Sequence, residues 1–133
     1  MNWISIFGIY IGYVLVNIII AKWNAVVVAD RIRKGNPKQI EHGWYFLLYV
    51  ALCVPQYWFI NLWFVGAVFC LHGSAFPVAY NLFRGITPFN LSKTSKSKYD
   101  QKLVQMGFKD MEIPDFIAEF VSALLFTISL FAN

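Results

Sequence analysis

The strongest candidate for chemistry is His72. It lies near the middle of an apolar stretch, residues 62–83, beside Ser74 and five residues before Pro77. Proline cannot donate a hydrogen bond to the carbonyl of Gly73, four residues earlier, so we expect the helix to bend or open there. An ionisable side chain beside an opened backbone is typical of sites where membrane proteins hold an ion, a proton or a ligand. The alternative is a neutral imidazole that donates one hydrogen bond to a neighbouring helix.

A second group of candidates lies in the last apolar stretch, residues 113–132. Four polar side chains there share one face of a helix, at offsets of 0, 4, 7 and 14: Asp115, Glu119, Ser122 and Ser129. Glu119 lies about 9 Å along a helix that starts at Ile113. A carboxylate at that depth needs a cation, a proton or a water-filled recess. Two interpretations are open: an ion site, and a structural clamp in which Glu119 pairs with one of three basic residues, Arg84, Arg31 or Lys22.

The first apolar stretch, residues 2–22, carries two different faces. Gly8 and Gly12 form a small-xxx-small pair, which lets another helix approach closely. We expect that helix to belong to the same chain; the alternative is a second copy of the protein. On the other face Asn17 places an amide at hydrocarbon depth, where it must find a partner. This face therefore points into the bundle, either to join two helices or to line a polar pocket.

Several polar residues gather at the end of the predicted helices that lies nearest the basic connections: Asp30, Glu41, His42, Asn81, Arg84, Asp115 and Glu119. Histidine and carboxylates together can ligate a divalent metal. The two histidines are thirty residues apart, however, with no HxxxH or HExxH spacing. The sequence therefore predicts no metal site and no cofactor. It also lacks a phosphate-binding glycine loop, and no Ser-His-Asp set can be argued from spacing.

The composition of the chain indicates whether these residues lie in a water-soluble protein or in a membrane. Of the 133 residues, 59% are hydrophobic, 19% aromatic and 14% charged, whereas soluble domains carry about 25% charged residues. A chain this short cannot bury so much apolar side chain in water. These figures exclude a soluble enzyme, a disordered tail and a small disulfide-stapled secreted protein. The two cysteines, Cys53 and Cys70, lie in apolar stretches, where thiols act as small hydrophobic groups.

All charged side chains fall in two windows, Lys22–Glu41 and Arg84–Glu119. A membrane-crossing helix needs about 20 mostly apolar residues, and the two ends of the chain each supply one. The uncharged stretch 43–83 would be about 60 Å long as a single helix, twice the hydrocarbon thickness, so it must fold back on itself. The sequence thus predicts four spans and two connections, with spans at about 2–22, 43–60, 62–83 and 113–132 and connections at 23–42 and 84–112.

The charge distribution also predicts an orientation. Four spans place both charged windows, which together contain all 11 Lys and Arg residues, on one side of the membrane. By the positive-inside rule the connections are cytoplasmic and both termini are non-cytoplasmic. The turn between the second and third spans is expected near Asn61, with Pro55 as a kink in the last turn before it. The tryptophans fall near the predicted interfaces, where amphipathic rings settle: Trp3, Trp23, Trp44, Trp58 and Trp63.

Both connections are expected to contain helix. The first span continues to about Arg33, before Gly35 and the residues after it end the helix. In the second connection, Ser97 and Asp100 have the spacing of a capping box, and Gly107 can end the short amphipathic helix that follows. Four lysines of this connection are expected to contact lipid headgroups: Lys93, Lys96, Lys98 and Lys102. Anionic lipid, at about 1 kcal/mol per lysine, accounts for this charge, so no nucleic-acid partner is predicted.

Together these features predict one all-α, polytopic membrane domain. It has four transmembrane helices in a bundle and a short amphipathic cytoplasmic helix between spans three and four. The expected function is non-enzymatic: a helix-packing subunit, or a small channel- or carrier-like oligomer that uses the polar interior around His72 and Glu119. The alternative is a membrane-embedded enzyme acting on a lipid head group, with these residues at the cytoplasmic interface: His42, Asp30, Arg84 and Glu119. The expected partners are a bilayer with an anionic inner leaflet and a second copy or a larger membrane complex.

Overall fold

The computed structural model describes residues 1–35, 42–91, 93 and 98–132, apart from the side chains of residues 42–44. Within these ranges all regular secondary structure is helical, as predicted. Six helices follow one another along the described chain: α1 (Trp3–Arg33), α2 (His42–Cys53), α3 (Gln56–Phe59), α4 (Leu62–Phe83), α5 (Lys98–Gln105) and α6 (Glu112–Phe131).

Three of these helices, α1, α4 and α6, are long and apolar enough to cross a membrane. They contain 31, 22 and 20 residues, and a crossing helix needs about 20. Much of their apolar surface stays exposed, since large side chains such as Trp3, Ile19, Phe116 and Phe120 are more than half exposed. Apolar faces of this extent are stable against lipid and unfavourable in water, which supports an integral membrane protein.

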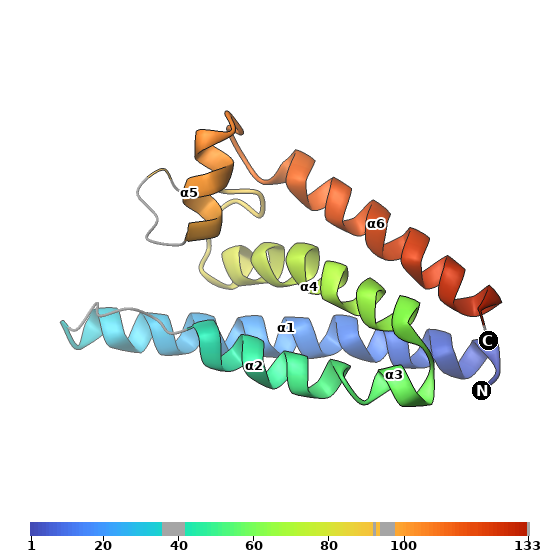
Figure 1. Cartoon of the computed structure of the whole chain (residues 1–133). Helices are drawn as coiled ribbons and strands as arrows, with labels where there is room; N and C mark the ends of the chain where they lie inside the picture. The colour runs from blue at the N-terminus through green and yellow to red at the C-terminus, as the bar shows by residue number, and fades with distance from the viewer. Residues whose placement is uncertain (36–41, 92, 94–97, 133) are drawn as a thin grey trace.

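Helix α4 lies between α1 and α6 (Figure 1). The two termini and the turn from α3 to α4 lie at one end of the molecule, and α5 lies at the opposite end. Helix α6 slants away from α1 toward the α5 end. The three long helices are therefore closest at the end that holds the termini and spread apart toward α5.

The predicted second span, residues 43–60, is not one continuous helix. Helix α2 ends at Cys53 and α3 starts at Gln56, with Pro55 as its N-cap. Proline has no backbone N–H, so the helical hydrogen bond to the carbonyl four residues earlier is lost at this position. The sequence predicted a kink here, and the structure shows a break. Helix α2, with 12 residues, extends only about 18 Å and cannot cross a bilayer alone.

The main buried core lies where α1, α2 and α4 meet. Its buried members are Ile6, Tyr13, Ile20, Tyr49, Cys53, Ile60, Phe64, Val68 and Leu71. Asn61 fixes the turn into α4 at the predicted position, because its side chain accepts a hydrogen bond from the Phe64 N–H at 3.0 Å. The Asn61 amide also donates to the carbonyl of Ser129 at 2.9 Å. One asparagine therefore caps α4 and connects its start to the end of α6.

Two glycines of α4 face α6. A Cβ atom at Gly66 would lie 3.2 Å from Leu125 Cδ1, and one at Gly73 would lie 4.0 Å from Ala118 Cβ. The two glycines are seven residues apart, so they lie on the same face of the helix. The contact at Gly66 is tight, so the missing side chain there favours the close packing of α6, whereas the contact at Gly73 is an ordinary van der Waals distance.

The glycine pair singled out in the sequence lies elsewhere. A Cβ atom at Gly8 or Gly12 would meet nothing within 4 Å, so neither residue contacts another helix in the described parts of the chain. The expected intrachain contact does not form, because small-xxx-small spacing shows that a helix can approach and does not show which helix does. Packing of this face against a second molecule stays a prediction.

The segment between α4 and α6 folds into a small unit with its own apolar core. The buried residues of this core are Leu91, Leu103 and Met111. Helix α5 is the predicted short helix, and it ends before Gly107, whose φ of +90° favours glycine. On this helix Leu103 is buried in the unit, while Tyr99 and Met106 stay exposed. The apolar side chains of α5 and its end therefore lie partly in the core of the connection and partly on its surface.

Candidate functional site

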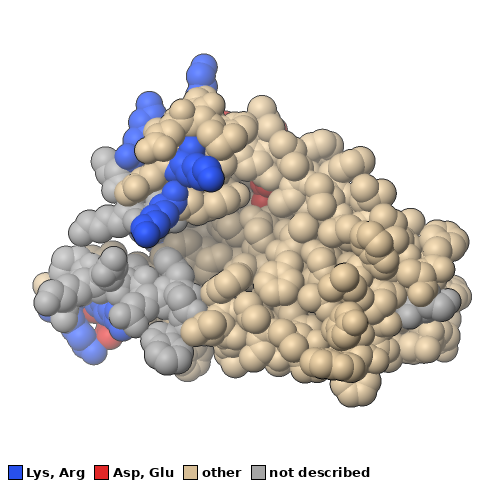
Figure 2. Space-filling view, in the orientation of Figure 1, with Lys and Arg blue, Asp and Glu red and all other residues tan. Residues whose placement is uncertain are grey.

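A cavity of about 460 Å³ lies between α1, α4 and α6, where the helices spread apart. Figure 2 shows the hollow in the surface, with acidic atoms on its wall. Most of the residues that line it are apolar, and three are polar: Ser74, Asp115 and Glu119. Its volume is within the range of about 300–1,000 Å³ that is typical of small-molecule sites.

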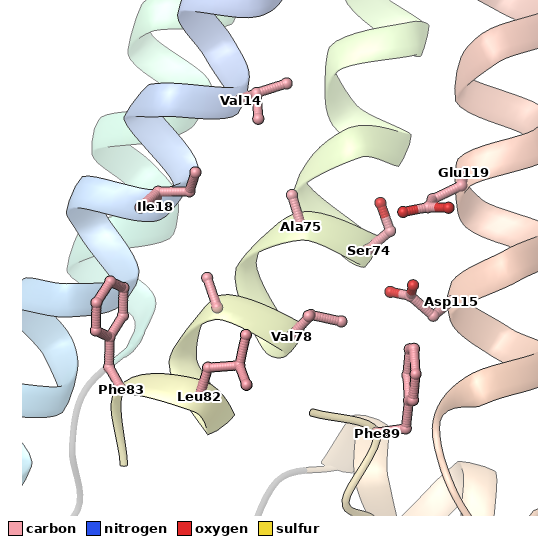
Figure 3. Close-up of a pocket in the computed structure, with 11 residues that line it drawn as sticks. Val14, Ile18, Ser74, Ala75, Val78, Leu82, Phe83, Phe89, Asp115 and Glu119 are labelled. Carbon is pink, nitrogen blue, oxygen red and sulfur yellow. The ribbon is translucent and has the colours of Figure 1, made fainter. Parts of the chain in front are cut away.

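The apolar wall of the cavity comes mainly from α1 and α4. Val14 and Ile18, one turn apart on α1, point toward the cavity, and Leu82 and Phe83 line it from the end of α4 (Figure 3). Leu82 is 57% exposed and Phe83 is 44% exposed although both line the cavity. The cavity is therefore open to the outside of the protein on an apolar side.

The polar wall comes from α6 and from one residue of α4. Asp115 and Glu119, one turn apart, point from α6 toward α4, where Ser74 lies (Figure 3). Asp115 is only 5% exposed, and its Oδ1 atom has no hydrogen-bond partner among the described residues. The Ser74 hydroxyl donates to the carbonyl of Leu71 at 3.1 Å, so its oxygen is left to accept. All three groups thus offer acceptor oxygens to the cavity.

No cation of the described chain neutralises this pair of carboxylates. Like charges one turn apart on a helix repel each other, and a buried carboxylate without a partner is unfavourable. The cost of burial falls on Asp115, because Glu119 is exposed. The position of Asp115 in the first turn of α6 offsets part of this cost through the helix dipole. Arg84, one of the candidates for a clamp with Glu119, does not pair with it. The Arg84 guanidinium lies instead 5.3 Å from the centre of the Tyr80 ring.

A chain of hydroxyl groups lies three residues beyond Glu119 along α6. Ser122 of α6 donates to the carbonyl of Ala67 on α4 at 2.7 Å. Since this uses the serine proton, the Tyr10 hydroxyl of α1 is the donor in its 2.6 Å bond to Ser122 Oγ. These two bonds join all three long helices.

Helix α5 brings a tyrosine toward the other end of the cavity. Partial burial, followed by the carboxylates of Asp100 and Asp115, raises the pKa of Tyr99 above its ordinary value. The electrostatic effect of Asp115 therefore reaches α5 and the connection that precedes α6.

His72 belongs to a different polar set, which joins α1, α2 and α4. Its Nδ1 atom lies 2.6 Å from Asn17 Oδ1, and the Asn17 amide donates to the carbonyl of Tyr13 at 2.8 Å and to the Tyr49 hydroxyl at 3.2 Å. Tyr49 in turn donates to the carbonyl of Val68 at 2.6 Å. We call these three side chains, Asn17, Tyr49 and His72, the Asn17 network.

The donors and acceptors of the Asn17 network fix the histidine tautomer. Because the Asn17 nitrogen donates twice, its oxygen is the acceptor, and His72 must carry a proton on Nδ1. The imidazole also stacks on two rings, with centres 4.5 Å away at Tyr49 and 5.1 Å away at Phe76. This arrangement matches the interpretation of His72 as a histidine that bonds across helices, and it lies outside the lining of the acidic cavity.

The remaining intramembrane candidate, Asn81, organises the chain after α4. Its amide donates to the carbonyl of Pro88 at 2.9 Å and to that of Asn90 at 3.3 Å. The N–H of Met111 then donates to the carbonyl of Phe89 at 2.8 Å. Asn81 thus holds the loop that places Phe89 at the mouth of the cavity.

The cytoplasmic-interface candidates do not converge on one point. Asp30 forms a 2.8 Å ion pair with Lys34 at the end of α1, and Arg84 stacks on a ring of its own helix. His42 begins α2, and its side chain lies outside the described part. Of the expected headgroup lysines, Lys96 also lies outside it, and these three are exposed: Lys93, Lys98 and Lys102. Figure 2 shows basic side chains gathered near α5.

The described residues contain no group of three or more His, Cys, Asp or Glu side chains that could hold a metal ion. Among the described residues, the structure brings the predicted candidates together in two places: Ser74, Asp115 and Glu119 line the cavity, and Asn17 bonds to His72. Sequence reasoning missed Tyr49, whose hydroxyl completes the Asn17 network. The only sequence evidence for such a partner is that Tyr10, Tyr13 and Asn17 share one helix face, whose polar groups need hydrogen-bond partners.

No model of a known protein family, no curated protein and no solved structure matches this chain. The cavity and the residues that line it are therefore the features from which a function can be inferred.

Proposed function

We propose that this chain is a small, non-enzymatic membrane protein that binds a cationic ligand in the acidic cavity, in the manner of a carrier or of a ligand-binding subunit. One observation carries the proposal: Asp115 is 5% exposed, lines a cavity beside Glu119, and has an oxygen without a hydrogen-bond partner in the described structure. A carboxylate in such surroundings needs a cation, a proton or water. A positively charged occupant supplies the missing partner.

The proposal includes four membrane crossings. Helices α1, α4 and α6 supply three. Residues 42–59, which contain α2 and α3, extend about 27 Å if helical throughout, close to the hydrocarbon thickness of about 30 Å. They would form an interrupted fourth crossing. With the basic windows on the cytoplasmic side, the acidic cavity lies in the cytoplasmic half of the membrane.

Protection from chemical labelling tests the binding of a cation. A hydrophobic carbodiimide labels carboxyl groups, and mass spectrometry resolves the labelled positions. Because methylamine also converts activated carboxyl groups into N-methylamides, the quantity measured is the loss of the free carboxyl group, as N-acylurea and N-methylamide together. We expect methylammonium chloride to slow this loss at Asp115 and Glu119 several-fold relative to sodium chloride, while the loss at the exposed Glu112 is unchanged. In an Asp115→Asn variant, protection at Glu119 is expected to weaken. Equal labelling of all three positions in both salts would contradict the proposal.

No contact among the described residues favours the alternative, an enzyme acting on a lipid head group. Asp30 pairs with Lys34, Arg84 stacks on Tyr80, and none of these lines the cavity with Glu119. Assembly with a second copy through the open face of Gly8 and Gly12 belongs to the proposal as a separate prediction.

A further inference from the structure

We infer that the ligand of the acidic cavity is an amphipathic primary amine, with one ammonium group and one alkyl chain, which enters from the surrounding lipid. The inference rests on the proposed function and adds the chemical class of the ligand. It follows from three properties of the cavity: the acceptors on one wall, the apolar surface of the other, and the open side between them.

The polar wall selects a group that donates hydrogen bonds. Asp115 Oδ1 lacks a donor, Glu119 forms no ion pair with the described residues, and Ser74 uses its proton within its own helix. A primary ammonium carries a positive charge and three N–H donors, which suits three oxygen acceptors. A quaternary ammonium has the charge and no N–H, so it leaves the Asp115 oxygen without a donor.

The apolar wall indicates that the ligand has an apolar part as well as a charged group. A cavity of about 460 Å³ lined mainly by aliphatic and aromatic side chains is far larger than an inorganic ion needs. Divalent cations are also poorly served here, because Ca²⁺ takes about 6–8 oxygen ligands and the cavity offers two carboxylates and one hydroxyl. An alkyl chain lying against Val14, Ile18 and Leu82 buries apolar surface that a small ion leaves empty.

The open side of the cavity indicates the route of entry. Ile18, Leu82 and Phe83 line the cavity and are 38%, 57% and 44% exposed. In the proposed membrane placement these residues face the surrounding lipid, and none of them is charged. A membrane-dissolved amine can therefore enter sideways with its chain in hydrocarbon throughout, until its ammonium group meets Asp115 and Glu119.

Photocrosslinking in lipid nanodiscs tests this inference. The probe is dodecylamine with a diazirine on its terminal carbon, and labelled residues are located by mass spectrometry. We expect labels on Val14, Ile18, Leu82 or Phe83. Asp115→Asn is expected to reduce them at least tenfold, whereas Glu112→Gln, which removes an exposed carboxylate from the same helix, leaves them unchanged. The matching trimethylammonium and alcohol probes are expected to label these residues several-fold less.

A cavity-filling variant tests the binding of the ligand's alkyl chain separately from the binding of its ammonium group. Ala75 points into the cavity (Figure 3), so Ala75→Phe takes up space that the alkyl chain needs. We expect it to lose the dodecylamine labels and to keep methylammonium protection at Asp115, which also shows that the variant is folded. If the Ala75→Phe variant kept the dodecylamine labels, the placement of the alkyl chain in the cavity would be contradicted.

The outcomes distinguish this inference from the proposed function. Equal labelling by the alcohol probe, or labelling that Asp115→Asn does not change, shows that the cavity holds neutral lipid and overturns the inference. If methylammonium protects Asp115 but the amine probe does not label the cavity, the proposed function stands and the inference fails. If methylammonium does not protect Asp115 and the amine probe does not label the cavity, both the proposed function and the inference fail.

Discussion

Nδ1 of His72 lies 2.6 Å from Oδ1 of Asn17, and this bond joins α4 to α1 beside the Tyr49 hydroxyl of α2. Each of these three side chains has a partner on another helix. Asp115 differs, since its buried Oδ1 atom has none in the described structure. The described structure thus contains polar groups that hold helices together, such as the Asn17 network, and a polar set that faces a cavity.

Removal of the central amide of the Asn17 network should destabilise the protein. Asn17→Leu leaves the His72 Nδ1–H and the Tyr49 hydroxyl without this partner. We expect the free energy of unfolding to fall by about 1 kcal/mol, the scale of a hydrogen bond between membrane helices. Denaturant unfolding in mixed micelles measures it. Thr127→Ala is the matched control, because Thr127 bonds only to the carbonyl of Ala123 in its own helix. Equal stabilities of the two variants would show that the network contributes nothing.

The two glycine pairs should respond differently to the same substitution. Gly66→Leu drives a side chain into Leu125 and forces α4 away from α6, so we expect a loss of about 1–3 kcal/mol in unfolding free energy. The leucine side chain of the Gly8→Leu variant meets open space. Both substitutions raise the helix propensity by a similar amount, because each replaces glycine by leucine. The Gly8→Leu monomer should therefore keep its stability. Light scattering of the Gly8→Leu variant tests assembly, which should weaken if a second copy packs there. A destabilised Gly8→Leu monomer, or an unaffected Gly66→Leu protein, contradicts the described packing.

The titration of Tyr99 should depend on Asp115. Because burial and two carboxylates raise its pKa, the neutral phenol is favoured in the folded state. This contribution to stability is fully present below the ordinary tyrosine pKa of about 10 and is lost as pH rises through the higher folded value. We expect Asp115→Asn to shift the ionisation of Tyr99 to lower pH, measured by ultraviolet difference titration against Tyr99→Phe. Asp110→Asn serves as the control. An unchanged Tyr99 titration would mean that Asp115 does not act on α5.

Cysteine labelling tests the proposed orientation. In a background without Cys53 and Cys70, we expect a membrane-impermeant thiol reagent to reach Lys34→Cys and Lys93→Cys only from the cytoplasmic side. Asn2→Cys, at the opposite end of α1, should react only from the other side. Labelling of the two lysine positions from opposite sides would rule out an even number of crossings between them.

The sequence predicted much of the helical layout because lipid imposes simple rules. The apolar stretches between the charged windows and at the chain ends predicted α1, α4 and α6. Gly107 predicted the end of α5, because glycine readily adopts the positive φ found there. Pro55 shows the limit of these rules. A missing N–H predicts a local distortion, but whether the helix bends or breaks depends on the surrounding packing.

The candidate site was predictable in part for a similar reason. Helical spacing alone places Asp115 and Glu119 on one face of α6, and it marks Asn17 as a residue that needs a partner. It cannot show that Ser74 faces the carboxylates or that Tyr49 meets Asn17, because these contacts depend on how the helices are turned relative to each other. The cavity itself arises from the slant of α6 away from α1, which no residue pattern encodes.

The most direct test of the account is a distance measured by solid-state nuclear magnetic resonance in lipid bilayers. The protein carries ¹³C in its aspartate carboxyl groups, and the ligand is ¹⁵N-methylammonium. A charge-assisted hydrogen bond of about 2.7–2.9 Å to the oxygen places the nitrogen about 3.5 Å from Asp115 Cγ. We predict a dipolar coupling of that size at Asp115, absent in Asp115→Asn. No coupling at Asp115 under saturating methylammonium would contradict the central claim that the acidic cavity binds a cation.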